Sequence, residues 1–303
     1  MTMVLATVLE VGVATVQDSG RQGHQRIGVP VAGPWHRLRY ESACRLLSDA
    51  PEAGMPAVEL LAGALSLLFS SEAAVAVVGS ARVTVGDQSA GPGTVIRVGA
   101  GAVVSIQGSG EGPAYLTVSG WSEKQSLGSC ATDTFSGLGG RVLVVGDELS
   151  GEAAMPDVHR VGMFQRPVPD ALGPVRVTSF GDPPAMDFFE RRWTVRRRSR
   201  SGVRLASNGW TGPATSIESM PVIPGTIQVT PDGEAIVLGP DGGLTGGYPV
   251  VGVIASVDLD RMSLPGEGES ITFTIVDTVI ASAAYVARRA RFLRSFANPR
   301  DLA

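Results

Sequence analysis

The chain has 303 residues, of which 44% are hydrophobic and 18% charged, and its formal net charge is −4. This apolar fraction is enough for a buried core and excludes a disordered chain, while the length fits two domains of about 150 residues. The negative charge excludes the basic whole-protein field that attracts nucleic acid.

Residues 1–149 are predicted to form a β-rich domain. Short apolar runs alternate with Gly, Ser and Ala at the spacing of an all-β sandwich or barrel. One helix is predicted over residues 35–47, with Cys44 on its buried side. The glycine-rich stretches 108–112 and 137–140 are predicted to be hairpin turns. The expected strands are 3–9, 13–16, 58–61, 65–69, 74–78, 82–85, 94–98, 102–106, 114–118 and 141–145.

Residues 150–172 lose this periodicity and contain three prolines, which indicates an interdomain linker or long loop. Residues 173–303 are then predicted to form a second β-rich domain. From Asp277, apolar residues recur at helical spacing up to Phe296, which predicts a C-terminal amphipathic helix. Its apolar stripe would pack on the second domain or meet a partner. The expected strands are 175–179, 193–197, 202–206, 226–230, 235–238, 250–257 and 270–275, with helical turns at 185–191 and 258–262.

No targeting, membrane or metal-binding segment is predicted. The N-terminus lacks a basic start followed by a long apolar core, and the longest apolar run, 73–78, is far below the ~20 residues of a membrane span. We therefore expect a cytoplasmic protein with reduced thiols. No Walker A loop surrounds Lys124, the only lysine, so no phosphate cradle is predicted. Three scattered histidines do not suit a metal site.

An arginine-rich segment and one cysteine each allow a functional interpretation beside a structural one. Six of the residues between 191 and 200 are arginines, with Trp193 as the only aromatic residue among them, which favours a solvated strand face or an anion-binding edge over a nucleic-acid site. Cys130 follows Leu127-Gly128-Ser129 in an expected loop, where it could be exposed, and a nucleophilic role is the minor alternative for it.

Two glycine-rich segments contain more polar side chains than packing needs. The first motif, residues 15–23 followed by 28–34, contains Gln17, Asp18 and Arg21. The second motif, residues 224–233 followed by 241–249, contains Gln228 and Asp241. Glycine lets a ligand approach the backbone closely, and polar side chains on rigid loops orient it. Ordinary turn chemistry explains the same residue types equally well.

These motifs resemble a known family. Thr-Val-Gln-Asp-x-Gly-Arg-x-Gly from residue 15, followed by Gly-Val-Pro-x-x-Gly from residue 28, is similar to the opening of the allophanate hydrolase subunit 2 family. This family is also described as KipA-like, as biotin-dependent carboxyltransferase proteins and as the C subunit of 5-oxoprolinase. The resemblance spans roughly residues 5–275. Its other matches are Glu59, 115–120, 127–129, 132–133, 202–205, 224–233, 241 and 245–249.

The resemblance implies two β-rich domains, the C-terminal one a cyclophilin-like β-barrel. It also implies a KipI-like subunit 1 as partner and, in the 5-oxoprolinase system, a third subunit, with ATP used by the complex. Relatives of the urea amidolyase type imply an alternative, in which CO₂ moves from carboxybiotin to urea. Biotin would then be carried by another protein. A third alternative is a non-catalytic regulatory partner of a KipI-like protein. Neither a membrane nor nucleic acid is an expected partner.

Site residues follow from the same resemblance. Asp18, Arg21 and Asp241 are the expected catalytic residues, by proton transfer or by pairing with an anion. The alternative for Asp18 and Arg21 is that the pair only locks its loop. We also expect both motifs to line one polar cleft. The expected substrate-binding residues are Gln17, Gln228, Thr245, Gly246, Gly247 and Tyr248.

The chain also departs from the family pattern. Where the family usually reads Ser-Gly-x-Met-Asp, this chain has Ala32 at the first position and His36 at the last. Cys130 stands where an Arg is usual after Leu-Gly-Ser, and Val250 stands where a Lys is usual after Gly-Gly-Tyr-Pro. A lost carboxylate and lost cations predict either a different acceptor or a binding and regulatory subunit.

Overall fold

A computed structural model of the chain describes residues 2–48, 54–152, 154, 164–165, 173–179, 186–212 and 217–297. The chain divides into two compact units. Unit 1 comprises Met1–Arg21, Ala32–Val168 and Phe292–Ala303, and unit 2 comprises Gln22–Val31 and Pro169–Arg291. The domain boundaries expected at residues 149 and 173 stay a prediction, and most of the expected linker 150–172 lies outside the described residues.

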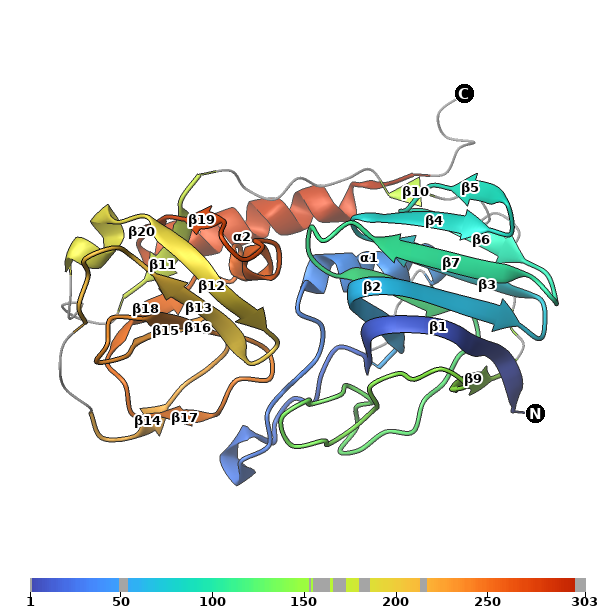
Figure 1. The fold of residues 1–303 in the computed structure, drawn as a ribbon, viewed down its shortest axis with the longest axis horizontal. Coiled ribbons are helices and arrows are strands. Elements are labelled where there is room, and N and C mark those ends of the chain that lie inside the picture. The colour runs from blue at the N-terminus through green and yellow to red at the C-terminus, as the bar shows by residue number, and fades with distance from the viewer. Residues whose placement is uncertain are drawn as a thin grey trace. The chain divides into compact units, whose positions relative to one another are not determined.

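Unit 1 is built on one large antiparallel sheet (Figure 1). Strand β1 (Met3–Gln17) pairs along its length with β2 (Ala57–Phe69), and β2 in turn pairs with β7 and β8. The order along the main path is β21-β10-β6-β3-β8-β2-β7-β4-β5, with β9 on the free side of β1. The other strands are β3 (Ala73–Val78), β4 (Ala81–Val85), β5 (Gln88–Ala90), β6 (Thr94–Val98), β7 (Val103–Gly108), β8 (Ala114–Val118), β9 (Glu148–Gly151), β10 (Phe164–Gln165) and β21 (Phe296–Ala297).

Two expectations about this sheet are corrected. The sequence predicted breaks in β1 and β2, but both run through, because register shifts between Val8 and Ala14 absorb the irregularity as bulges. The strand predicted over residues 141–145 is absent. Val142 makes only an isolated bridge with Thr15, and its side chain is exposed, so the β-branched residues there do not reflect a buried strand.

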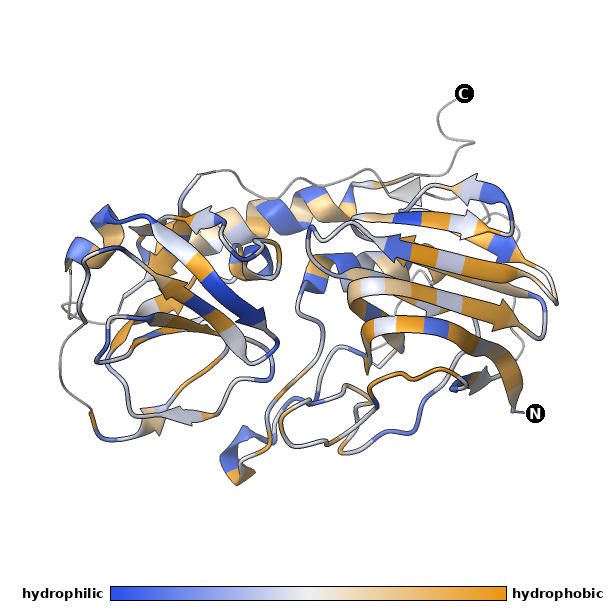
Figure 2. Cartoon of the chain, in the orientation of Figure 1, coloured by the Kyte–Doolittle hydropathy of each residue, from blue (hydrophilic) through white to orange (hydrophobic). Residues whose placement is uncertain are grey.

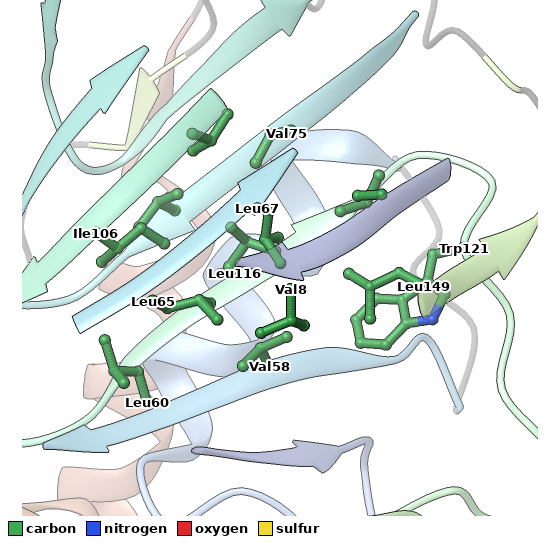
Figure 3. Packing of buried hydrophobic residues seen from close by; sticks show 14 of the residues in the cluster. Val8, Val58, Leu60, Leu65, Leu67, Val75, Ile106, Leu116, Trp121 and Leu149 are labelled. Atoms are coloured by element: carbon green, nitrogen blue, oxygen red, sulfur yellow. The ribbon is translucent and has the colours of Figure 1, made fainter. Parts of the chain in front are cut away.

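The core of unit 1 lies on one face of this sheet. Figure 3 shows Val8 of β1 and Val58 of β2 packed beside Leu67 and Leu116, with Trp121 and Leu149 at one end. These side chains are at most 5% exposed. Along β7, buried residues alternate with half-buried or exposed ones, which is the period of two that sequence patterning uses, whereas β3 and β8 are buried on both faces.

Helix α1 (Arg37–Leu47) confirms the predicted helix. His36 is its N-cap, and the His36 Nδ1 atom accepts the Arg39 backbone N–H at 3.3 Å. Tyr40 and Cys44 are buried in a second apolar cluster with residues of β3 and β8. Burial raises the pKa of the Cys44 thiol to about 12. Cys44 is therefore a core residue, as the sequence predicted. A short turn, η1 (Gln25–Ile27), precedes the helix.

Unit 2 contains an eight-stranded sheet in the order β19-β12-β13-β16-β15-β18-β11-β20. The two strands at the ends of this path, β19 (Ser270–Ile271) and β20 (Phe273–Ile275), are consecutive in the chain, so the sheet curls into a nearly closed barrel (Figure 1). The other strands are β11 (Val175–Thr178), β12 (Trp193–Ser199), β13 (Gly202–Ala206), β15 (Thr226–Val229), β16 (Ala235–Leu238) and β18 (Val250–Ile254), and β14 (Met220–Pro221) pairs separately with β17 (Thr245–Gly246).

The predicted mainly β class with a C-terminal helix is thus confirmed. Short turns η3 (Met186–Glu190) and η4 (Leu259–Ser263) lie where helical turns were expected. The inside of the unit 2 sheet is aromatic: the Phe188 ring lies 4.4 Å from Trp193 and 5.4 Å from Phe273, between ring centroids. Neither α-helix in the described part of the chain combines the length and apolar character of a bilayer-crossing segment.

Helix α2 (Thr278–Leu293) corrects one detail of the predicted terminal helix. It ends before Phe296, which begins β21. Arg288 joins the helix to the rest of unit 2, since its Nη1 donates to the Val257 carbonyl and lies 3.4 Å from Asp260 Oδ2. The expected contact of the apolar stripe with a partner stays a prediction. Val279 and Val286 are 74% and 66% exposed, so apolar and polar residues mix along the helix surface (Figure 2).

Candidate functional site

The first motif lies where β1 ends and the chain turns out of the sheet of unit 1. A loop of residues 129–133 runs beside it. The Thr132 backbone N–H donates to the Val16 carbonyl at 3.0 Å, and the Thr132 hydroxyl donates to the same carbonyl at 2.7 Å. These contacts bring together two segments more than 100 residues apart, which sequence spacing alone does not reveal.

Asp18 joins the first motif to this loop. Its carboxylate is fully buried and accepts three hydrogen bonds. The Gly20 N–H donates to Oδ1 at 2.8 Å, the Ser129 hydroxyl donates to Oδ1, and the Cys130 N–H donates to Oδ2 at 2.7 Å. Both carboxylate oxygens are thus occupied by the protein's own donors. The geometry gives Asp18 a role in holding the loop.

Gln17 and Arg21 have polar atoms that the protein does not satisfy. Gln17 Nε2 donates to Thr15 Oγ1 and to the Thr132 carbonyl, both at 3.0 Å, whereas its Oε1 is buried without a partner among the described residues. Arg21 is 1% exposed, and its Nη2 donates to the Ala131 carbonyl. Its Nε and Nη1 atoms are buried and have no partner in the same part of the chain.

The predicted Asp18–Arg21 pair does not form an ion pair. The acceptor of the Arg21 guanidinium is a backbone carbonyl, and the Asp18 carboxylate is bonded to Gly20, Ser129 and Cys130. Gly139 makes the position of Arg21 possible. With φ of +97°, its backbone is left-handed, and a Cβ atom there would collide with Arg21 Nη2 and the Ala131 carbonyl.

Cys130 is buried rather than exposed, so the expectation of an accessible loop thiol was wrong. Its side chain faces the interior at 1% exposure because its backbone N–H is held by Asp18. Burial, and after it the negative charge of Asp18, raises the pKa of this thiol well above its usual range. A thiolate nucleophile at neutral pH is therefore disfavoured.

Glu59, a residue of the family pattern, organises the segment before α1. The Trp35 N–H donates to Glu59 Oε2 at 2.8 Å, and the Tyr115 hydroxyl donates to the same oxygen. The His36 N–H in turn donates to the Tyr115 hydroxyl at 2.8 Å. His36, which stands where the family usually has Asp, thus caps a helix and belongs to a buried network.

In unit 2, Asp241 of the second motif is locked by Arg200. Arg200 Nε donates to Oδ2 at 2.8 Å and Nη2 donates to Oδ1 at 2.6 Å, and both side chains are at most 2% exposed. The Asp241 N–H also donates to the Arg200 carbonyl at 3.1 Å. This bidentate geometry is the strongest ion-pair arrangement available to a carboxylate, and it fixes the hairpin turn at Arg200.

The remaining residues of the second motif divide by exposure. Gln228 on β15 is 5% exposed, and its Nε2 is buried without a partner in the described residues. Gly246 of β17 lies against this amide, since a Cβ atom there would collide with Gln228 Nε2. Thr245 and Tyr248 are exposed, and Gly247 is half-buried. The structure therefore brings Gln228 and Gly246 together.

Three residues that shape these sites were not predicted as site residues. Ser129 holds Asp18, Gly139 makes room for Arg21, and Arg200 locks Asp241. Ser129 belongs to the motif Leu127-Gly128-Ser129, whereas Arg200 is one of six arginines between residues 191 and 200. Nothing in the sequence distinguished it from its neighbours. The expectation that both motifs line one cleft stays a prediction.

Comparison with known proteins identifies relatives over most of the chain. Residues 27–275 match the family described as carboxyltransferase domain, subdomain A and B. The chain is 28% identical over 276 residues to the C subunit of 5-oxoprolinase from Haemophilus influenzae, covering 87% of this chain and 88% of that protein. It is 28% identical over 306 residues to urea amidolyase of Lachancea kluyveri, covering 88% of this chain but only 16% of that protein.

Solved structures show the same architecture. The chain superimposes on the crystal structure of TTHA0988 with a TM-score of 0.80 and 28% identity, covering 90% of this chain and 55% of that one. It superimposes on K. lactis urea amidolyase with a TM-score of 0.81 and 25% identity, covering 96% of this chain and 20% of that one. In both cases the chain corresponds to one part of a longer protein.

Proposed function

The chain belongs to the carboxyltransferase domain family, subdomains A and B, and from this premise we propose that it is a subunit 2 (KipA-like) component of a heteromeric complex. The complex acts on amide or lactam C–N bonds with ATP, as in the allophanate hydrolase and 5-oxoprolinase types. The similarity to a protein named as the C subunit of 5-oxoprolinase, over 88% of its length, supports a multisubunit setting. In this proposal the chain turns over substrate only with a KipI-like subunit 1, with a third subunit in the 5-oxoprolinase case, in the cytoplasm. The barrel of unit 2 is proposed to be cyclophilin-like.

The observation that carries the proposal is the pair of unsatisfied groups in the first motif. Leaving a buried polar group unbonded costs about 1–3 kcal/mol, so native proteins rarely do so without a use for it. Gln17 Oε1 accepts hydrogen bonds, and Arg21 Nε and Nη1 donate them. A lactam or amide supplies the complementary N–H and carbonyl oxygen. We assign Gln17 to the substrate N–H and Arg21 to the oxygen on which negative charge grows when the C–N bond is attacked.

The two aspartates are assigned positioning roles. All the hydrogen bonds that Asp18 accepts hold the loop on which Gln17 and Arg21 rest. Asp241 is enclosed by Arg200. In the second motif, Gln228 Nε2 is a buried donor without a partner among the described residues, and we propose it as a ligand-binding group together with Thr245, Gly246, Gly247 and Tyr248.

Carboxyl transfer is the second candidate, supported by the description of the family and by the similarity to urea amidolyase. Carboxybiotin carried by another protein would supply the carboxyl group. The orphaned polar atoms fit that group, since Arg21 suits a carboxylate oxygen and Gln17 Oε1 suits a ureido N–H. No ATP-binding loop or biotin carrier motif is recognisable in this chain, so both cofactors would enter through partners.

A regulatory role is the third candidate, favoured by what replaces the family's charged residues. His36 is used as a helix cap, and Cys130 is a buried thiol where the family usually has Arg. A chain that lacks these groups retains the fold and the partner surface with less capacity to bind an anionic intermediate.

Coexpression with a KipI-like protein and a third 5-oxoprolinase subunit tests the proposal. We expect ATP-dependent conversion of 5-oxoproline to glutamate by the complex and none by this chain alone. Arg21→Met should abolish turnover while the complex still assembles. Arg82→Met, at an exposed position of β4, should leave both turnover and assembly unchanged. Full activity of Arg21→Met contradicts the proposal. Urea-dependent carboxyl transfer would support the second candidate, and inhibition of the partner without turnover would support the third.

A further inference from the structure

Two arginines face each other across the β12–β13 hairpin of unit 2. Arg197 on β12 pairs in register with Arg204 on β13, and Ile236 of β16 continues the row. Side chains paired in this way project from the same face of a sheet, with Cβ atoms about 4.5–5.5 Å apart. Like charges in this position destabilise a sheet. Glu234 compensates the charge of Arg204, whereas Arg197 has no carboxylate partner among the described residues.

A bulge sets this juxtaposition. The register shifts between Val195 and Arg197, so that Arg196 is the extra residue of β12 and Arg197 takes the position opposite Arg204. Bulges commonly re-aim a side chain near a binding site. The carboxyl end of β12 is the most hydrophilic part of this strand (Figure 2).

The two arginines are exposed and line an open surface pocket of about 240 Å³. Two hydroxyl groups, one backbone glycine and one apolar side chain complete its wall, and every lining residue belongs to unit 2. The lining residues are Arg197, Ser199, Ser201, Gly202, Arg204 and Ile236.

The charge of this wall is positive. Arg204 Nη1 donates to Glu234 Oε2 at 2.8 Å, in a pair that is 48% and 31% exposed. Arg197 has no ion pair among the residues that the structure describes. The exposed Arg204–Glu234 pair is weak, so an incoming anion can share Arg204.

The turn that carries the serines is braced by a buried ion pair. Arg200 stands between Ser199 and Ser201, and its buried bidentate bond to Asp241 fixes the backbone of the hairpin tip. A fixed backbone lowers the entropy lost when a ligand binds. The backbone that carries the two serines is thus in place before an anion arrives.

We propose that this pocket binds a small oxyanion, with the carboxylate or phosphate group held by Arg197 and Arg204. Guanidinium groups bind either oxyanion with two parallel N–H···O bonds. The Ser201 hydroxyl adds a donor, and the Ser199 hydroxyl, which donates to the Gly202 carbonyl at 3.4 Å, adds a second when it turns to the anion. Ile236 contacts the apolar part of an organic acid. None of the residues that line this pocket is used in the proposed function, and binding here does not depend on that function.

Binding is tested on the full chain by calorimetric titration and thermal unfolding at constant ionic strength, with inorganic phosphate in one arm and succinate in the other. We expect saturable binding in at least one arm, which identifies the source of the oxyanion, and sodium chloride should give no saturable effect. Arg197→Gln should weaken binding at least about tenfold.

Two variants keep the test sharp. Arg196→Gln removes the same charge from the adjacent, exposed bulge residue, and binding should change less than about twofold. Arg197→Lys keeps the charge but loses the bidentate geometry, so it should bind more weakly than the original chain. Absence of saturable binding in both arms overturns the proposal, as does an equal loss in Arg196→Gln and Arg197→Gln.

Discussion

The two polar motifs contain similar residue types but differ in what the protein leaves open. In unit 1, the first motif buries an unpaired acceptor on Gln17 and unpaired donors on Arg21. In unit 2, the second motif closes its carboxylate, Asp241, against Arg200 and leaves open only the Gln228 amide. A glycine-rich loop with polar side chains can therefore serve ligand binding or fold stability. The hydrogen-bond partners, not the residue types, decide between the two roles.

The largest expected effect is the loss of stability when the Arg200–Asp241 ion pair of the second motif is broken. Asp241→Ala leaves Arg200 buried without its partner, and breaking a buried ion pair in this way costs about 3–5 kcal/mol of the free energy of unfolding. Urea unfolding followed by tryptophan fluorescence measures it. Replacing both residues by Arg200→Met with Asp241→Leu should recover much of the loss. If Asp241→Ala has the same free energy of unfolding as the original chain, the ion pair does not stabilise the fold.

A second buried carboxylate extends the comparison within unit 2. Asp258 accepts hydrogen bonds from Arg176 Nε at 2.8 Å and from Nη2 at 2.7 Å. Burial raises the pKa of Asp258, but the hydrogen bonds from Arg176, together with the positive charges of Arg261 and Arg176, outweigh burial and bring the pKa below its usual range. We expect Asp258→Asn to cost about 1–3 kcal/mol at pH 7.

The pH dependence of the same variant follows from the sign of this shift. The unfolded chain binds the proton at a higher pH than the folded one, so the stabilisation by Asp258 is complete above the unfolded pKa of about 4. It is lost as the pH falls through the lower folded pKa. Denaturation measured between pH 7 and pH 2 should show a smaller acid loss in Asp258→Asn. An identical acid profile in both proteins would contradict this assignment.

In the first motif, by contrast, replacing the arginine should change stability very little. Arg21→Met removes a buried guanidinium that makes one hydrogen bond to the Ala131 carbonyl and has two unsatisfied nitrogens. Loss of the bond and relief of the unpaired groups oppose each other, so the free energy of unfolding should change by about 1 kcal/mol or less. The same urea experiment checks this. Destabilisation as large as that of Asp241→Ala would make Arg21 a structural residue.

The smallest expected effect concerns the two thiols. Burial raises the pKa of Cys44 to about 12 and that of Cys130 further, so neither should react in the folded protein. At pH 8, a colorimetric thiol reagent should detect no rapid reaction in the folded chain and both cysteines after unfolding. Rapid labelling of Cys130 in the folded chain would show that its loop opens.

Local pattern was enough for most elements of the fold. The spacing of apolar residues located α1, β13 and β16 because strands and helices bury one face at a fixed period. The spacing did not predict that β1 and β2 are continuous strands. A glycine within a strand can mark either a bulge or a turn, and the pattern does not distinguish the two. It also predicted a strand over residues 141–145, because β-branched composition does not report burial.

The sequence by itself determined the mainly β class, the helices and the family, since period, turn residues and motif order are properties of the chain alone. Tertiary structure decided which polar residues are engaged. Ser129 reaches Asp18 across 111 positions and Arg200 reaches Asp241 across 41, and only folding shows that these contacts satisfy both aspartates while Arg21 stays unsatisfied. Hydrogen bonding depends on distances of a few ångströms, and those distances are set by how separate segments pack.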